Sequence, residues 1–243
     1  MSNVVILTTK LKEERDYWLT KLSREIGASS LPLDFSRPAV YAEERAVVDV
    51  TLAAGVSQRL EKMTGNSPFL LYTMLMASLK ACLHKYTGSS TIVVGSPAYR
   101  RDEETNEQAD PLVMVDDIDE RQTFREFLMS VRETLSEAYA RQSYPLDNLV
   151  KDLEFEPVEN KCPLFDIALV LKEIHCELPH VKNDITMILE RTSDAVTGNI
   201  FYNPQLFRRE SIAGISANSP AAGGCVPLWH NVARLREAPE FAL

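Results

Sequence analysis

A short apolar run at residues 91–95 (TIVVG) most constrains the fold of this chain. Turn-forming residues bound the run, which is typical of a central strand buried on both faces. Residues 69–86, just before it, carry apolar side chains nearly all round a helical projection, which predicts a helix covered on several sides. Ser67 and Pro68 predict where this helix begins, because serine suits the N-cap and proline suits the first helical position. The two segments together require helices layered on a sheet.

Apolar periodicity predicts further helices and strands around this pair. Thr123 and Glu126 form a capping-box pattern, and the helix behind them has its apolar residues on one stripe. The predicted helices span residues 11–26, 56–63, 124–138 and 145–153, and the predicted strands span 45–52, 112–115, 165–171, 184–190 and 198–203. Because helices and strands are interspersed, we predict an α/β (α+β) fold, a mixed β-sheet covered by helices.

The composition predicts one globular core and argues against several classes of partner. The 243 residues are 45% hydrophobic and 25% charged, which is enough for one sizeable core. The net charge of -9 argues against a nucleic-acid or membrane partner, because phosphate binding needs clusters of lysine and arginine. No apolar stretch is long enough to span a bilayer, and the pattern of a signal peptide is absent. The four cysteines form no CxxC pair, which predicts reduced thiols and a cytoplasmic location.

Sequence patterns for metal, nucleotide and esterase sites are weak or absent. His175, Cys176 and His180 supply only three candidate zinc ligands, whereas a structural zinc site needs four, so we expect no metal. The acidic residues in the segment 116–120 lack the glycine-containing loop pattern that binds calcium. The GxSxG, P-loop and GxGxxG sequences do not occur. We therefore expect no directly bound cofactor.

Five segments in chain order resemble the second half of a nonribosomal peptide synthetase condensation domain. They are DYWLTKL, LPLDFSRP, HKYTGSSTIVVGSPAYRR, RQSYPLDNLV and CPLFDIALVL, and the resemblance runs from about residue 11 to about residue 212. It implies a chloramphenicol acetyltransferase-like single lobe, the C-terminal one of two. The family's catalytic motif HHxxxDG belongs to the first lobe and does not occur in this sequence. The resemblance therefore implies no catalytic residue here, because the second histidine of that motif is the one that assists the reacting amine.

The resemblance also implies residues that organise the site. Arg101 matches the last arginine of the family's VVGSPxxxR, which forms a salt bridge with the aspartate of HHxxxDG across the two lobes. The alternative for Arg101 is an exposed charge at a strand end. The family's (H/N)QDxPFExLV is matched or conservatively replaced by Gln142, Tyr144, Pro145 and Asp147. This segment either lines the acceptor side of the substrate channel or supplies a helix start, with Pro145 at the first helical position.

Two segments depart from the family pattern, and the end of the chain does not match it. Residues 108–111 (QADP) stand where the family has GxFVNT near the channel, and Pro157 and Val158 replace the first arginine and aspartate of RDxSRNPL. After residue 212 the sequence SANSPAAGGCVP is rich in small residues, glycine and proline. We therefore predict a condensation-type lobe at residues 1–212 and a non-matching flexible tail at residues 213–243.

The resemblance implies amide-bond-forming acyl transfer between carrier-bound substrates, as in the biosynthesis of antibiotics and other secondary metabolites. It implies a chain that is not catalytic alone, with an N-terminal condensation lobe or synthetase and carrier domains as partners. The substrates would arrive on the phosphopantetheine arms of carrier proteins. A second hypothesis is a non-enzymatic module that docks to a synthetase or forms a homo-oligomer through the apolar face left without its partner lobe. A third is a standalone acyltransferase that uses His84 or His175.

Overall fold

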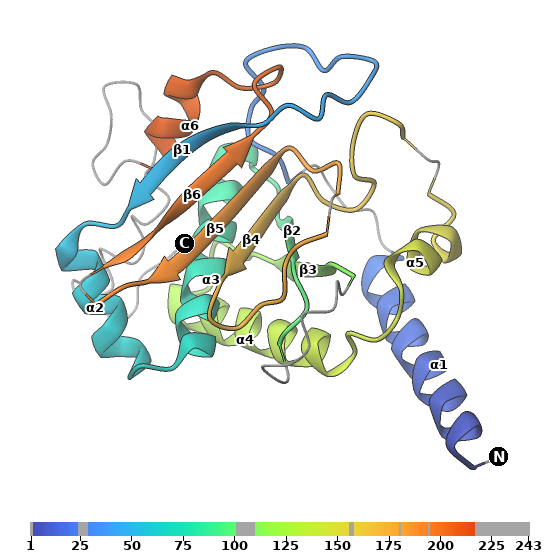
Figure 1. The fold of residues 1–243 in the computed structure, drawn as a ribbon. Helices are drawn as coiled ribbons and strands as arrows, with labels where there is room; N and C mark the ends of the chain where they lie inside the picture. The colour runs from blue at the N-terminus through green and yellow to red at the C-terminus, as the bar shows by residue number, and fades with distance from the viewer. Residues whose placement is uncertain are drawn as a thin grey trace.

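A mixed sheet forms the centre of the computed structural model, which describes residues 2–23, 29–100, 110–155, 158–179, 181–193 and 195–216. In this part of the chain the sheet has six strands in the order β1-β6-β5-β4-β2-β3 (Figure 1). The pairs β2–β4 and β4–β5 are parallel and the other pairs are antiparallel. The strands are β1 (Ala46–Thr51), β2 (Thr91–Ser96), β3 (Leu112–Asp117), β4 (Ile167–Leu171), β5 (Ile185–Arg191) and β6 (Val196–Tyr202).

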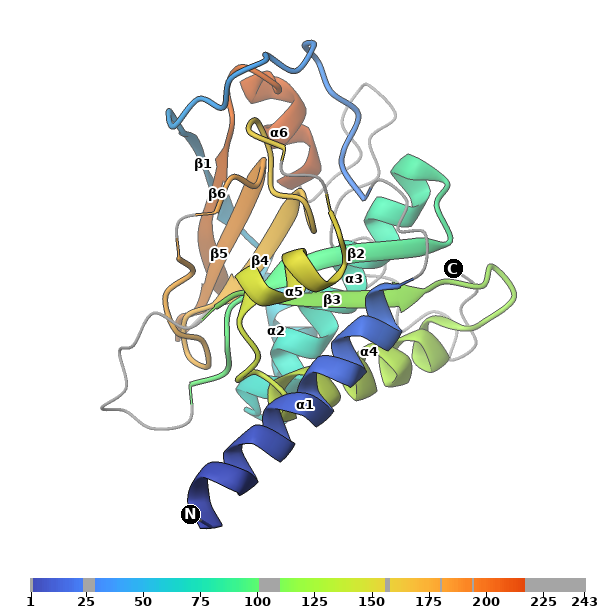
Figure 2. The ribbon, with the colours of Figure 1, turned by 90° about the vertical axis from the view of Figure 1, so that its right-hand side faces the viewer.

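Helices cover one face of the sheet and the edge formed by β3. The helices are α1 (Ser2–Leu22), α2 (Ala54–Thr64), α3 (Pro68–Thr87), α4 (Phe124–Ala140), α5 (Leu146–Asp152) and α6 (Arg209–Ser216). Figure 1 shows α3 and α4 behind the sheet, and Figure 2 shows α1 crossing in front of β3 and α4. No described helix lies over the front face of β1, β6 and β5 in Figure 1. The mixed sheet with covering helices that the sequence predicted is therefore confirmed.

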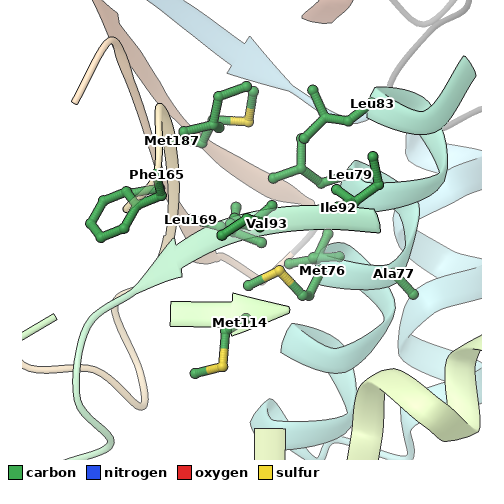
Figure 3. Close-up of a cluster of buried hydrophobic side chains, with 14 of the residues drawn as sticks. Met76, Ala77, Leu79, Leu83, Ile92, Val93, Met114, Phe165, Leu169 and Met187 are labelled. Carbon is green, nitrogen blue, oxygen red and sulfur yellow. The ribbon is translucent and has the colours of Figure 1, made fainter. Parts of the chain in front are cut away.

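The core lies between the sheet and α3. Figure 3 shows Met76, Leu79 and Leu83 of α3 near Ile92 of β2 and Met187 of β5. Burial alternates along β1 and β5, whereas every residue of β4 is buried. The double-sided burial predicted for the run at 91–95 is confirmed at residues 92–95, which are all buried. The strands near β2 are thus enclosed on both faces, and the outer strands β1 and β6 have one bare face.

The predicted starts of α3 and α4 are also confirmed. Ser67 Oγ accepts a hydrogen bond from Leu70 N at 3.4 Å, and Pro68 is the first helical residue. Thr123 and Glu126 exchange both hydrogen bonds of a capping box. Each bond satisfies a backbone amide that the first turn of a helix leaves without a partner.

Two predicted helix starts were wrong by different amounts. The first helix was predicted from residue 11, but α1 begins at Ser2. The β-branched residues at its start lower helix propensity, which hid this part of the helix from the sequence pattern. Pro145 was predicted at the first helical position, but it is the N-cap residue of α5, with a ψ of 137° that is extended and not helical. The helix α6 crosses the predicted boundary at residue 212, and most of the predicted tail, residues 217–243, lies outside the described residues.

A buried ion pair joins α3, β3 and α4. Lys80 and Asp116 form a salt bridge, and their side chains are 0% and 1% exposed. Lys80 Nζ also donates to Met114 O at 2.8 Å, and Thr134 Oγ1 donates to Asp116 Oδ1 at 2.6 Å. Burial lowers the pKa of Lys80, and the Asp116 carboxylate opposes that change. The pair therefore needs both partners, because each charge alone has no water to solvate it.

Replacing one partner of this pair destabilises the fold more than replacing both. Lys80→Met leaves the Asp116 carboxylate buried without its cation, and we expect a loss of about 3–5 kcal/mol in the free energy of unfolding. The double variant Lys80→Met with Asp116→Leu should recover much of that loss. Urea denaturation monitored by circular dichroism measures both. Lys85→Met, at an exposed position of the same helix, is the control. A single variant as stable as the control would contradict the role of the pair.

Candidate functional site

The candidate site is the segment that leaves β2, where the motif VVGSPAYRR exits the sheet. Gln142 Oε1 accepts a hydrogen bond from Tyr99 N at 2.9 Å, and Gln142 Nε2 donates to Tyr99 O at 3.1 Å. The side-chain amide thus pairs with the backbone of Tyr99 as a neighbouring strand would. This contact joins two motifs that lie 43 residues apart in the sequence. The predicted site residue Gln142 is therefore positioned to fix the direction in which the chain leaves β2.

The chain after Gln142 is held by α1. Tyr144 Oη donates to Asp152 Oδ2 at 2.5 Å, and the same oxygen accepts from Arg15 Nε at 2.7 Å. Ser143 N donates to Glu14 Oε2 at 2.9 Å, on a glutamate that is only 2% exposed. These bonds fix the turn between α4 and α5 against a helix from the far end of the sequence. Tyr144 thus has a bracing contact within this turn.

The other predicted site residues lie around this turn or outside the described residues. Asp147 is exposed in the first turn of α5, where a carboxylate suits the positive end of the helix dipole. Pro145 precedes it as the N-cap residue. Arg101 lies outside the described residues, as do residues 108–109 of the departing segment. Its neighbour Arg100 is described, and Arg100 Nη2 donates to His175 O at 2.6 Å and Lys172 O at 3.3 Å.

A buried chain of hydrogen bonds lies directly beneath this exit segment, and no local sequence pattern indicated it. Tyr72 Oη lies 2.8 Å from Ser96 Oγ, Ser96 Oγ lies 3.0 Å from Tyr139 Oη, and Tyr139 Oη lies 2.8 Å from His175 Nε2. The four residues come from α3, β2, α4 and the segment after β4. Burial raises the pKa of both tyrosines, so their hydroxyls stay protonated. The chain of bonds ties both helices to the end of the motif strand.

The protonation state of His175 follows from its partners. Leu171 N can only donate, so His175 Nδ1 accepts its hydrogen bond at 2.9 Å. The single proton of the neutral ring is therefore on Nε2, which donates to Tyr139 Oη. Burial lowers the pKa of His175 to about 3, and the charge of Arg100 adds to this effect. Both ring nitrogens are engaged, which leaves His175 no lone pair for removing a proton from a substrate.

A second arginine anchors the LPLDFSRP segment to the start of β5. Arg37 Nη1 donates to Asp184 Oδ1 at 2.8 Å, and Arg37 Nη2 donates to Asp184 Oδ2 at 2.5 Å. Asp184 is 0% exposed, and this two-bond pairing fixes both charge and orientation. The Asp184 carboxylate raises the pKa of Arg37, which keeps the guanidinium charged. The sequence pattern predicted Asp184 at the start of a strand, and a buried carboxylate there required a cation that periodicity does not identify.

A pocket of about 560 Å³ lies on the bare face of the sheet, next to the exit segment. Because β4 and β5 are parallel neighbours, residues 172–184 must run back along the sheet between them. The pocket, here called the crossover pocket, lies between this connection and the strands. The connection contributes Leu178 and Val181, and the strands contribute Val170, Thr186, Ile188 and Phe201. Arg100 and Arg45 also line it.

Metal and membrane features are not found in the described part of the chain. No group of three or more histidine, cysteine and acidic side chains is arranged there to hold a metal ion. His180, one of the three candidate ligands, lies outside the described residues. None of the helices in the described ranges has the length and hydropathy needed to cross a bilayer.

The buried state of His175 predicts a pH-dependent stability. Its pKa is about 3 in the folded chain and about 6.5 in an unfolded one, so its stabilising effect is complete above pH 6.5 and declines as the pH falls towards 3. At pH 5.5 the loss attributable to His175 is about 1.4 kcal/mol. Urea denaturation at pH 7.5 and pH 5.5 should show a smaller loss for His175→Asn than for the wild type. Equal losses would contradict the assignment.

Comparisons with known proteins agree with the fold and the motifs described above. The family described as "Condensation domain" matches residues 5–219. The linear gramicidin synthase of Brevibacillus parabrevis contains a segment that is 30% identical over 228 residues, with 85% of this chain and 4% of that protein covered. Bacitracin synthase 1 of Bacillus licheniformis is 28% identical over 227 residues, with 85% of this chain and 4% of that protein covered. This chain thus spans only a small part of the length of these relatives. The predicted resemblance to nonribosomal peptide synthetases is confirmed.

Solved structures show the same chloramphenicol acetyltransferase-like fold. The X-domain from teicoplanin biosynthesis has a TM-score of 0.78 at 20% identity, with 96% of this chain and 56% of that chain covered. A four-domain nonribosomal peptide synthetase has a TM-score of 0.76 at 19% identity, with 95% of this chain and 20% of that chain covered. With the family match over most of its length, this chain belongs to the condensation-domain family of the nonribosomal peptide synthetases.

Proposed function

We propose that the chain is the C-terminal lobe of a condensation domain and forms amide bonds only beside an N-terminal lobe. The observation that carries this proposal is the family match over residues 5–219 in a sequence without HHxxxDG. The X-domain structure supports it, because this chain covers 56% of that chain. The bare sheet face beside the exit segment offers a surface for the second lobe.

In this proposal, the chemistry joins two substrates held on carrier proteins. The amine of the acceptor attacks the thioester carbonyl of the donor, the new C–N bond forms, and the C–S bond breaks to release the carrier thiol. The histidine of the other lobe assists by taking the amine proton or orienting the amine. No cofactor binds this chain directly, since the phosphopantetheine arms belong to the carriers.

The residues of this chain act in the proposal by positioning. Arg101 pairs with the aspartate of HHxxxDG and braces the catalytic loop across the two lobes. Gln142 fixes the backbone of Tyr99, two residues before Arg101, so the arginine starts from a defined point. Tyr144, Pro145 and Asp147 belong to the turn at the acceptor side of the channel. The reacting groups themselves come from the other lobe and the substrates.

A second candidate function is a non-enzymatic module that binds a synthetase or a second copy of itself. The bare face of the sheet favours it, since Val47 of β1 is 42% exposed and its cross-strand neighbour Phe201 is only partly buried. An apolar surface of this kind commonly marks an interface. The same experiment separates the two candidates.

Assembly with an N-terminal lobe tests the proposed function. We expect a one-to-one complex in analytical ultracentrifugation with a separately expressed lobe that carries HHxxxDG, and amide product from carrier-bound substrates only in the mixture. Arg101→Ala should lower product formation about tenfold or more, because it removes a charge-assisted hydrogen bond. Arg125→Ala, at an exposed position of α4, should not. Product from the chain alone or no complex would overturn the proposal, and a homo-oligomer without a complex would favour the second candidate.

Gln142 predicts a separate effect on the assembled domain. Gln142→Leu removes both hydrogen bonds to Tyr99, and we expect product formation to fall about tenfold because the exit segment loses its fixed direction. The dissociation constant of the two lobes should change little, since Gln142 contacts its own chain. Gln58→Leu, at an exposed position of α2, is the matched control. If Gln142→Leu weakens only the complex or only the thermal stability, Gln142 is not a positioning residue.

A further inference from the structure

The crossover pocket contains one guanidinium whose charge is not neutralised by the described residues. Arg100 forms no ion pair within the described ranges, and its Nη2 donates only to backbone carbonyls. Its Nε is buried and has no hydrogen-bond partner there. A buried donor without a partner costs free energy, and an unused guanidinium next to a cavity is a ready partner for an anion.

The other charges at the pocket are already engaged or point to solvent. The terminal nitrogens of Arg45 donate to Asp184 O at 2.7 Å, to Tyr41 Oη at 2.6 Å and to Asn183 O. Lys172 Nζ pairs with Glu190 Oε2 at 2.8 Å. The one carboxylate in the lining, Glu177, is exposed and forms no salt bridge with a described residue. An anion in the pocket therefore meets Arg100 first.

The remainder of the pocket is mainly apolar. Val170, Ile188 and Phe201 line it from the strands, and Leu178 and Val181 line it from the connection. Its volume of about 560 Å³ is that of a small-molecule site, which typically combines apolar walls with a few fixed polar groups. The neutral His175 contributes no charge at the Arg100 end. The pocket thus offers one cationic end and an apolar wall.

We infer that the crossover pocket binds an acyl chain that ends in a carboxylate, with the carboxylate on Arg100 and the apolar chain along Val170, Ile188 and Phe201. Arg100 supplies the charge and its unused Nε donor, while the strands exclude water from the chain. This site goes beyond the proposed function and does not depend on it, because every group it uses belongs to this lobe. Binding is therefore measurable on the chain alone, without catalysis.

Isothermal titration calorimetry with hexanoate tests the site, and hexanamide serves as its neutral counterpart. We expect hexanoate to bind about tenfold or more tightly than hexanamide, which lacks the charge-assisted bonds to Arg100. Arg100→Gln should reduce hexanoate binding to the level of hexanamide. Arg125→Gln makes the same charge change at an exposed position of α4 and should leave binding unchanged. Equal binding of the two probes by the wild type, or no binding of hexanoate, would overturn the inference.

A second variant tests the apolar part and does not rely on Arg100→Gln folding correctly. Ile188→Trp places a large side chain in the pocket and should abolish binding of both probes, while circular dichroism confirms that the chain is folded. If folded Ile188→Trp binds hexanoate as well as the wild type, the ligand does not occupy the crossover pocket and the inference fails.

Discussion

The chain of hydrogen bonds from Tyr72 through Ser96 and Tyr139 to His175 is the constraint on which the rest of this structure depends. It joins two helices, the end of the motif strand and the segment after β4 within one buried cluster. Each polar group there is enclosed by protein, so each must find its partner inside the molecule. Both the exit segment above it and the crossover pocket beside it therefore rest on a base with one allowed arrangement of protons.

Polar side chains that substitute for backbone partners are the recurrent device around this base. Gln142 meets both polar atoms of the Tyr99 backbone, and Arg45 meets the carbonyls of Asn183 and Asp184. Ser29 Oγ accepts from Val93 N at 2.8 Å, beside the stretch where β2 and β4 share only one paired position. Irregular segments are expensive to bury because their amides and carbonyls need partners. These side chains allow loops to lie against the sheet at the positions where the family motifs occur.

Local patterns in the sequence were enough for the helices and strands, and too little for the contacts between them. The apolar run at 91–95, the Ser67 cap and the Thr123 capping box depend on neighbours a few residues apart, so periodicity finds them. The strand order and the Gln142–Tyr99 contact join distant segments, which periodicity does not encode. Lys80 is an intermediate case. It lies within a helix predicted to be covered on several sides, which already indicated a buried charge, but nothing local identified Asp116 as its partner.

The position of β1 at the edge of the sheet has a consequence for synthesis on the ribosome. Its strand partner is β6, and the paired residues Asp49 and Asn199 lie 150 residues apart. Translation adds about 5–20 residues per second, so β1 leaves the ribosome roughly ten seconds before β6. During that interval β1 is an edge without its neighbour, and such edges pair readily with other chains. The charge of Asp49 on its outward face counters this hazard, in the way that charged side chains protect the edges of natural sheets.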